Sequence, residues 1–342
     1  MPKPARGPSN SKRLEAHPSP KPQFGRFLCY NKDMNFQNVE NARKELKDKY
    51  QKSLFITSGI ISAILVILLF ALDIFHGGLQ GIIFLIFALI FALTIGLIVA
   101  TIATKKLSQT YRRAYKAYFV EQNLKKTFTN LIYDHEKGLA KDYLKSTGMI
   151  NTGDRYSSND LTVAKYKNVK FTQADAHIQT QHTDSDGNTY YITIFRGRFM
   201  IFEFPKKFDF KLELIGKRFS AARIPGKDKE IHRKMTKKST ESTEFNKAFR
   251  IFGQDDYESF YILDPALMVK IMTISEHYKN NLLFGYYDNQ LLIALNDGKD
   301  SFEPPRFTKP IDEKAELAKI HNDIKVITDF VDQLSLDKKL FK

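Results

Sequence analysis

Two long stretches without a charged side chain constrain this sequence more than any other feature. Residues 53–72 form a run of 20 residues, and residues 81–103 form a run of 23. A helix needs about 20 apolar residues to cross the hydrocarbon core of a bilayer, and it satisfies its own backbone hydrogen bonds there. The pattern predicts a transmembrane helical hairpin. The alternative is a pair of buried core helices, which is disfavoured because such long core helices usually carry a polar stripe.

Basic residues flank the hairpin on both outer sides. Five precede it (Arg43, Lys44, Lys47, Lys49 and Lys52) and five follow it (Lys105, Lys106, Arg112, Arg113 and Lys116), while the link 73–80 has no Lys or Arg. Because positive charge is retained on the cytoplasmic side, both termini are predicted to be cytoplasmic. We therefore expect a two-span protein of the cytoplasmic (inner) membrane whose function lies on the cytoplasmic side.

The hairpin itself is predicted to be an anchor. Its polar side chains are all hydroxyls, such as Thr57, Ser58 and Thr94, whereas ion and proton pathways usually contain an ionisable residue. A small oligomeric channel is the alternative.

The first 50 residues are predicted to form a disordered basic arm. Six of the twelve prolines lie within residues 1–30, and a segment of this composition cannot build a core. The single cysteine, Cys29, falls in this arm. One cysteine excludes a disulfide framework and a zinc site made of cysteines.

Residues 105–150 are predicted to be a juxtamembrane helical segment. Tyr111, Tyr115 and Tyr118 repeat at helical spacing, and neither Pro nor Gly interrupts residues 105–133. The pattern predicts one helix over this range, whose aromatic side packs on the domain downstream. A separate partner-binding stripe is the alternative.

Residues 151–342 are predicted to be a cytoplasmic α+β domain. The segment 208–214 alternates apolar and charged residues, as half-buried strands do. We expect two strands joined by a turn or a bulge within 190–204, a hairpin over 282–295 and a strand at 259–263. A helix is expected to start at Asp264, because Asp is a good N-cap. Hairpins with helices at the ends favour a mainly antiparallel sheet with flanking helices.

The last helix, starting near Asp312, carries a heptad-like apolar seam. Its members are Leu317, Ile320, Ile324, Ile327, Val331 and Leu334. The seam is shorter than the three to four heptads that indicate a coiled coil, so docking onto the domain's own sheet is expected. A helix partner or self-association is the alternative.

Basic side chains outside the spans are candidates for contact with anionic lipid. They are Lys105, Lys106, Arg112, Arg113, Arg233, Lys234, Lys237 and Lys238. Positive charges close to an anionic leaflet are attracted to it, and a solvated surface is the alternative. No RNA-binding motif accompanies them, so we expect no specific nucleic acid partner.

Catalytic signatures are absent from the sequence. The eight histidines show no H-E-x-x-H spacing, and there is no P-loop, G-x-S-x-G or G-x-G-x-x-G. We therefore predict no catalytic residue, cofactor or metal. Enzymes can lack such signatures, so an enzyme acting at the cytoplasmic membrane face remains an alternative.

Several short motifs in the domain resemble a bacterial family known as domain of unknown function 3137. They read F-N-K-A-F at 245–249, Q-D-D-Y-E-S-F-Y-I-L-D-P at 254–265, F-E-P at 302–304 and F-R-G-R-F at 195–199. The chain departs from the family in having Phe260 where arginine is common, and in lacking tryptophan. The resemblance implies two membrane spans followed by a soluble domain over residues 40–342, and it brings no established activity.

Together these patterns predict a membrane-anchored cytoplasmic binding or scaffolding module. Its expected partners are the lipid bilayer and a protein, either another protein or a second copy of the chain.

Overall fold

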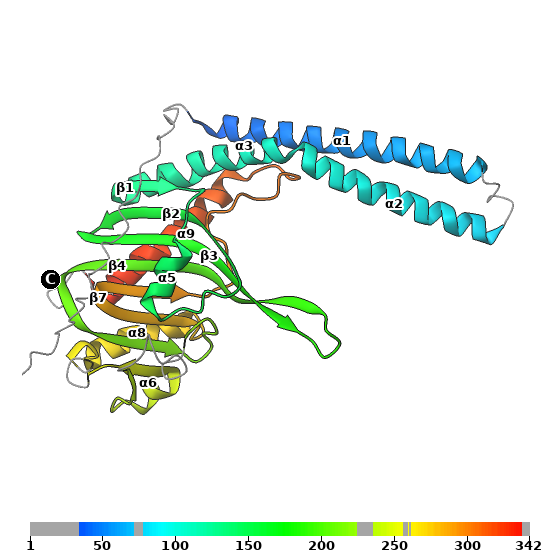
Figure 1. The fold of residues 1–342 in the computed structure, drawn as a ribbon. Helices are drawn as coiled ribbons and strands as arrows, with labels where there is room; N and C mark the ends of the chain where they lie inside the picture. The colour runs from blue at the N-terminus through cyan, green and yellow to red at the C-terminus, as the bar shows by residue number, and fades with distance from the viewer. Residues whose placement is uncertain (1–33, 72–77, 224–234, 256–258, 260, 337–342) are drawn as a thin grey trace, which may run out of the picture. The chain divides into compact units, whose positions relative to one another are not determined.

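Two long apolar helices begin the computed structural model (Figure 1), which describes residues 34–71, 78–223, 235–255, 259 and 261–336. Helix α1 spans Phe36–Ala71 and α2 spans Leu79–Ala103, and both are long and apolar enough to cross a membrane. Only 6% and 11% of the residues in their most apolar windows are buried. This exposure disfavours the alternative of two buried core helices.

Small residues let the two helices pack closely. Ala92, Gly96 and Ala100 are buried on α2. A Cβ at Gly96 would lie 3.0 Å from the Cβ of Ser58 on α1, which is closer than ordinary van der Waals contact. Such small residues allow helices to approach in a membrane, where no hydrophobic effect drives them together.

The prediction that residues 1–50 are disordered is wrong for the last part of that range, because α1 begins at Phe36. The Asn35 side chain accepts a hydrogen bond from the backbone N–H of Asn38 at 3.0 Å, which satisfies a free donor at the helix start. Val39 and Leu46 are buried, so burial of apolar side chains also stabilises this part. Residues 1–33 lie outside the described residues.

The predicted single helix over 105–133 is also wrong at its end. Helix α3 (Lys105–Tyr115) continues as the π-helix η2 (Lys116–Glu121) and α4 (Gln122–Thr127), and then β1 (Thr129–Asp134) joins the sheet. Pairing of β1 with the following strand overrides the helical pattern of its residues. The sheet therefore begins before the predicted domain boundary at residue 151.

One antiparallel sheet forms the rest of the fold and confirms the α+β class. Its other strands are β2 (Arg155–Tyr166), β3 (Val169–Thr183), β4 (Thr189–Gly216), β5 (Thr236–Lys238), β6 (Phe249–Gly253) and β7 (Leu282–Leu295). The strand order is β1-β2-β3-β4-β6-β5, and β7 pairs with β4. All the pairings are antiparallel.

The predicted division of residues 190–204 and of residues 282–295 into two strands each is wrong. β4 and β7 are continuous strands that pair with each other over most of their length. A Cβ at Gly197 would lie 2.0 Å from the Leu295 carbonyl oxygen. Only glycine therefore allows the backbones of β4 and β7 to come so close at this position. Asp288 adopts a left-handed φ of 48° within β7, next to shifts in strand register. Both residues thus lie within continuous strands and do not end them.

Residues 184–188 form the turn that joins β3 to β4. The Asp184 carboxylate accepts hydrogen bonds from the backbone N–H groups of Asp186 and Asn188. Figure 1 shows this hairpin extending beyond the rest of the sheet.

The helices of the domain begin mostly at capping residues. They are α5 (Lys141–Thr147), α6 (Thr243–Ala248), α8 (Pro265–His277) and α9 (Glu313–Leu334). Asp264 accepts a hydrogen bond from Leu267 N–H at 2.7 Å and so caps α8, as predicted. The strand predicted at 259–263 is wrong, since residues 259, 261 and 262 are helical.

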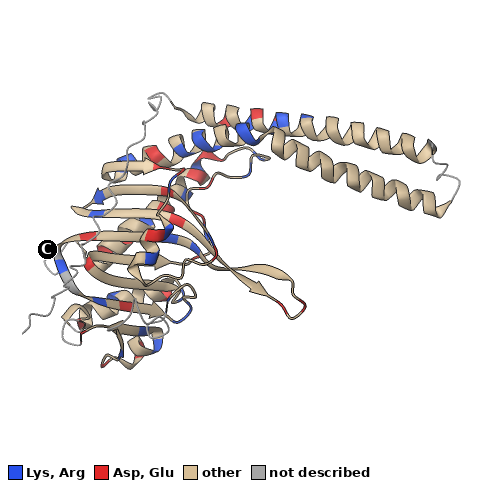
Figure 2. Cartoon of the chain, viewed as in Figure 1, with Lys and Arg blue, Asp and Glu red and all other residues tan. Residues whose placement is uncertain are grey.

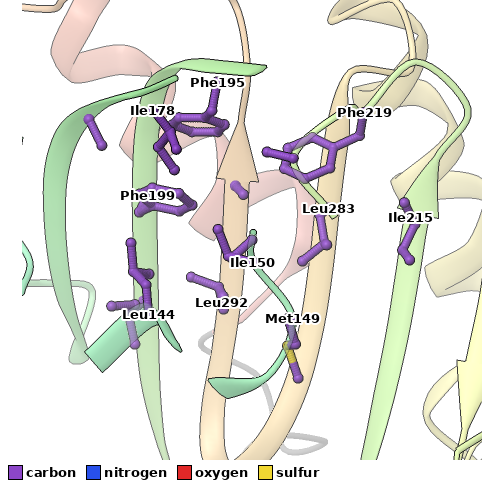
Figure 3. Packing of buried hydrophobic residues seen from close by; sticks show 14 of the residues in the cluster. Leu144, Met149, Ile150, Ile178, Phe195, Phe199, Ile215, Phe219, Leu283 and Leu292 are labelled. Carbon is purple, nitrogen blue, oxygen red and sulfur yellow. The ribbon is translucent and has the colours of Figure 1, made fainter. Parts of the chain in front are cut away.

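Apolar side chains cover both faces of the sheet. Figure 3 shows one cluster, in which Leu144 and Met149 from the α5 region meet Phe195, Phe199 and other sheet residues. On α9, the buried side chains include Ile320, Ile324, Ile327, Val331 and Leu334. Most of the seam on α9 therefore packs inside this domain.

Candidate functional site

The helices α3 and η2 join the apolar hairpin to the sheet domain through polar side chains. The Tyr111 hydroxyl donates to the Pro305 carbonyl at 3.0 Å, and the Tyr115 hydroxyl donates to Glu316 at 2.6 Å. Both tyrosine side chains are buried. Burial is the largest cause that raises the pKa of each hydroxyl. The aromatic side of this segment thus packs on its own domain.

Lys116 lies at the centre of a buried cluster of charges. Its Nζ lies 2.8 and 2.7 Å from the two carboxylate oxygens of Asp160 and 3.0 Å from Glu303 Oε1. The side chains of Lys116 and Asp160 are 1% and 0% exposed. The Tyr133 hydroxyl donates to Asp160 at 2.5 Å, and Arg112 pairs with Glu303. A buried charge is tolerated when it is paired and hydrogen-bonded in this way.

Burial dominates the titration of this cluster. It raises the pKa of the Asp160 carboxyl, and the nearby Lys116 ammonium opposes this effect. Burial also raises the pKa of Asp175 to about 8, an effect that Arg198 opposes. Asp175 accepts a hydrogen bond from the backbone N–H of Ser301 at 2.5 Å. The cluster therefore continues from β2 into β3 and into the loop before Phe302.

A second buried cation ties the same loop to the last helix. Arg198 on β4 donates to the Asp323 carbonyl at 2.7 Å and to the Ser301 hydroxyl at 2.5 Å. Phe302 is fully buried and has a left-handed φ of 61°. Non-glycine residues in this region are strained unless their surroundings hold them. The loop that contains Ser301 and Glu303 is therefore held by Arg198 at Ser301 and by Lys116 at Glu303.

A polar pocket of about 550 Å³ lies over the Lys116 cluster. Its lining residues come from α3, the loop after β1, β2 and the loop before Phe302, and they are Gln109, Arg112, Arg113, His135, Glu136, Ser157, Ser158, Asn159 and Asp300. All of them have polar side chains. Figure 2 shows that the charged residues of α3 are all basic and that the adjoining domain carries both signs of charge, whereas α2 carries no charged residue.

Charged groups in the pocket wall are partly paired with one another. Arg113 forms a salt bridge with Glu136 at 2.7 Å. Asp300 makes no salt bridge to any described residue, and its carboxylate accepts a long hydrogen bond of 3.5 Å from the Asn159 amide. Buried atoms Arg112 Nε and His135 Nε2 have no hydrogen-bond partner in the described part of the chain. Burial lowers the pKa of His135, which favours the neutral imidazole.

Three carboxylates of this region lie close enough to share a metal ion. One oxygen from each of Asp160, Asp300 and Glu303 lies within 4.8 Å of the others. Lys116 Nζ already contacts two of the three. The lysine ammonium supplies the positive charge that these two carboxylates require.

The predicted lipid-contact residues fall into separate places. Lys105 and Lys106 are exposed on α3, and Arg112 and Arg113 line the pocket. Lys237 and Lys238 lie on β5, at the opposite edge of the sheet from β1. Arg233 and Lys234 lie outside the described residues. The structure therefore does not bring Lys237 and Lys238 to the same edge as α3.

Sequence reasoning missed Lys116, Asp160 and Asp175 as members of a site. A signal existed for Lys116, because it interrupts the otherwise apolar and aromatic run from Tyr115 to Val120. The π-helix that starts at Lys116 gave no readable signal, although such segments are frequent at functional sites. Asp160 has a left-handed φ of 57° within β2, which is a tertiary property.

Comparison with known proteins supplies a family resemblance and no activity. No curated protein matches this sequence. The crystal structure of the mycobacterial trehalose monomycolate transport factor A is similar with a TM-score of 0.34 and 8% identity, covering 65% of this chain and 94% of that one. Residues 193–336 match the family described as protein of unknown function (DUF3137). This match includes β7, α8 and α9, and it confirms over residues 193–336 the resemblance that the sequence motifs predicted.

Proposed function

We propose that this protein is a membrane-anchored binding module whose α+β domain faces the cytoplasm. In this proposal α1 and α2 cross the cytoplasmic membrane and both termini are cytoplasmic. The exposed apolar surfaces of the two helices support the crossing. The basic residues on both outer flanks and their absence from the link support the orientation.

One observation carries the proposal: α3 follows α2 after a single residue, Thr104, and is built into the domain. Arg112 contacts Glu303, and the next turn of helix brings Lys116 to Asp160. Because the rise is 1.5 Å per residue, Arg112 lies no more than about 14 Å from Ala103 along the helices. The domain is therefore held at the membrane surface. Confinement of this kind raises its effective concentration toward other membrane proteins or a second copy.

Exposed lysines next to the apolar segments of α1 and α2 favour contact with anionic lipid headgroups. Lys49 and Lys52 lie on α1, and Lys105 and Lys106 lie on α3, close to the apolar segments. Each such charge contributes about 1 kcal/mol near an anionic surface. We therefore assign lipid contact to these lysines. We do not assign lipid contact to Lys237 and Lys238, because they lie on β5 at the far edge of the sheet.

An enzyme acting at the membrane face is the second candidate, and the polar pocket favours it. Catalytic sites often combine a cleft with titratable groups whose pKa values are shifted. Here the groups with raised pKa values, Asp160 and Asp175, are fully buried. Lys116 is enclosed by two carboxylates. Binding therefore fits the pocket better than catalysis does.

Alkaline extraction of native membranes tests the anchor. Carbonate at high pH removes peripheral proteins but leaves proteins held by transmembrane helices. We expect the full chain to stay in the membrane pellet, and to float with lipid in a density gradient. Release into the supernatant would contradict the proposal. Crosslinking of the full chain in the same membranes then distinguishes a second copy from a different protein partner.

A further inference from the structure

The pocket beside α3 offers complementary groups that the protein leaves unsatisfied. Arg112 Nε is a buried donor without an acceptor among the described residues, and His135 Nε2 lacks a hydrogen-bond partner there as well. Asp300 is a carboxylate without a salt bridge in the same set of residues. A buried polar atom without a partner costs free energy. Groups of this kind at a concave surface indicate a ligand that satisfies them.

The charge on the pocket wall restricts what that ligand can be. The wall carries two guanidinium groups, Arg112 and Arg113, and two carboxylates, Glu136 and Asp300. Arg112 already pairs with Glu303 and Arg113 with Glu136, whereas Asp300 has no cation among the described residues. A simple anion would face both carboxylates, and a simple cation would face both guanidinium groups. A ligand that carries one group of each sign meets neither repulsion. The hydroxyl of Ser157 and the amide of Asn159 add neutral hydrogen-bonding groups.

From these observations we propose that the pocket binds a phosphate–ammonium zwitterion, with its phosphate at Arg112 and Arg113 and its ammonium at Asp300. A phosphate group suits this wall because its several oxygens accept hydrogen bonds from different directions. The ammonium gives Asp300 the cation that it lacks. A pocket of about 550 Å³ has room for such a group.

The position of the pocket suggests two sources for this chemistry. It lies on α3, close along the chain to the end of α2, where the phosphoethanolamine headgroup of a membrane lipid would be at hand. Free phosphoethanolamine has the same two groups. The lipid source rests on the proposed function, because it requires α2 to lie in the membrane. The chemistry of the pocket does not depend on it.

Calorimetric titration of the full chain in detergent tests the pocket. The probes are phosphoethanolamine, inorganic phosphate and ethanolamine. Phosphoethanolamine is expected to bind saturably and at least about tenfold more tightly than either fragment. Asp300→Asn should weaken phosphoethanolamine about tenfold and leave inorganic phosphate within about twofold, whereas Arg113→Gln should weaken both. Melting curves by circular dichroism verify that the variants are folded.

Matched controls change the same residue types elsewhere. Arg218→Gln removes an exposed guanidinium after β4, outside the pocket, and Asp186→Asn removes an exposed carboxylate at the β3–β4 turn. Both should bind phosphoethanolamine as the unmodified chain does. Absence of saturable phosphoethanolamine binding would overturn the proposal, as would an Asp300→Asn variant that binds it unchanged.

A lipid arm distinguishes the two sources. The chain is placed in nanodiscs that contain phosphatidylethanolamine and phosphatidylglycerol, and the lipid it retains is identified by native mass spectrometry. Selective retention of phosphatidylethanolamine, lost in Asp300→Asn, supports the headgroup. If the protein binds phosphoethanolamine in the calorimetric titration but does not selectively retain phosphatidylethanolamine, the result supports free phosphoethanolamine as the ligand. Release of the protein by carbonate would contradict the membrane anchor but would not affect the titration result. Failure of the proposed function and failure of the pocket proposal are therefore distinguishable.

Discussion

Glu213 gives a quantitative prediction about stability and pH. It lies between Leu212 and Leu214 in β4 and is 0% exposed. Neither of its carboxylate oxygens has a hydrogen-bond partner in the described part of the chain. Burial raises its pKa from 4.5 to about 8, an effect that the charge of Lys211 opposes. The folded chain therefore keeps a proton on Glu213 at neutral pH.

The direction of the pH effect follows from proton binding. Between pH 4.5 and 8 the unfolded chain loses the proton of Glu213, whereas the folded chain keeps it. The contribution to stability is complete below pH 4.5 and declines as the pH rises toward 8. The two pKa values differ by about 3.5, which corresponds to a loss of about 5 kcal/mol. The loss from pH 5 to pH 8 is about 3–4 kcal/mol.

The substitution Glu213→Gln removes the titration and preserves the shape of the side chain. Thermal unfolding of the full chain in detergent is followed by circular dichroism from pH 5 to pH 8. The melting temperature of the unmodified chain should fall relative to that of the variant by roughly 10 °C over this range. Any constant offset from the buried amide is the same at each pH. The control Glu241→Gln changes an exposed glutamate and should follow the unmodified chain. Parallel curves for Glu213→Gln and the unmodified chain would refute the reasoning.

Three further substitutions test other parts of the structure. Lys116→Met leaves a buried carboxylate without its cation and should lower the free energy of unfolding by about 3–5 kcal/mol, while the exposed Lys126→Met should change it little; equal melting temperatures would contradict this. Gly96→Leu has no space against α1 and should destabilise the helix pair in detergent, whereas the control Gly59→Leu points into open space. The measurement is the yield of folded protein after purification, and equal yields of the two variants would contradict this prediction. Asp264→Ala removes the cap of α8 and should cost about 1 kcal/mol, measured by thermal melting, and no change would mean that the cap is dispensable.

Local signals in the sequence predicted the elements that depend on nearby residues. The uncharged runs gave α1 and α2, and Asp264 and Asp312 marked the starts of α8 and α9. The α+β class followed from alternating strands. These features were predictable because backbone capping and hydrophobic periodicity act over a few residues.

Features that depend on distant parts of the chain were not predictable in this way. Residues Thr129–Asp134 resemble a continuing helix, yet they form a strand because β2 is available to pair with them. Asp288 resembles a turn residue, yet β7 continues past it because β4 pairs with β7 on both sides of this residue. The Lys116 cluster joins residues 44 and 187 positions apart. Only the folded sheet brings such residues together.

Labelling of single cysteines in intact cells tests the central claim most directly. Cys29 is replaced by Ser, and either Gln80→Cys at the start of α2 or Asp186→Cys at the β3–β4 turn is introduced; both positions are exposed. A maleimide that cannot cross membranes should label position 80 in intact cells and position 186 only after the cells are permeabilised. Labelling of position 186 in intact cells, or of position 80 only after permeabilisation, would contradict a domain held on the cytoplasmic face.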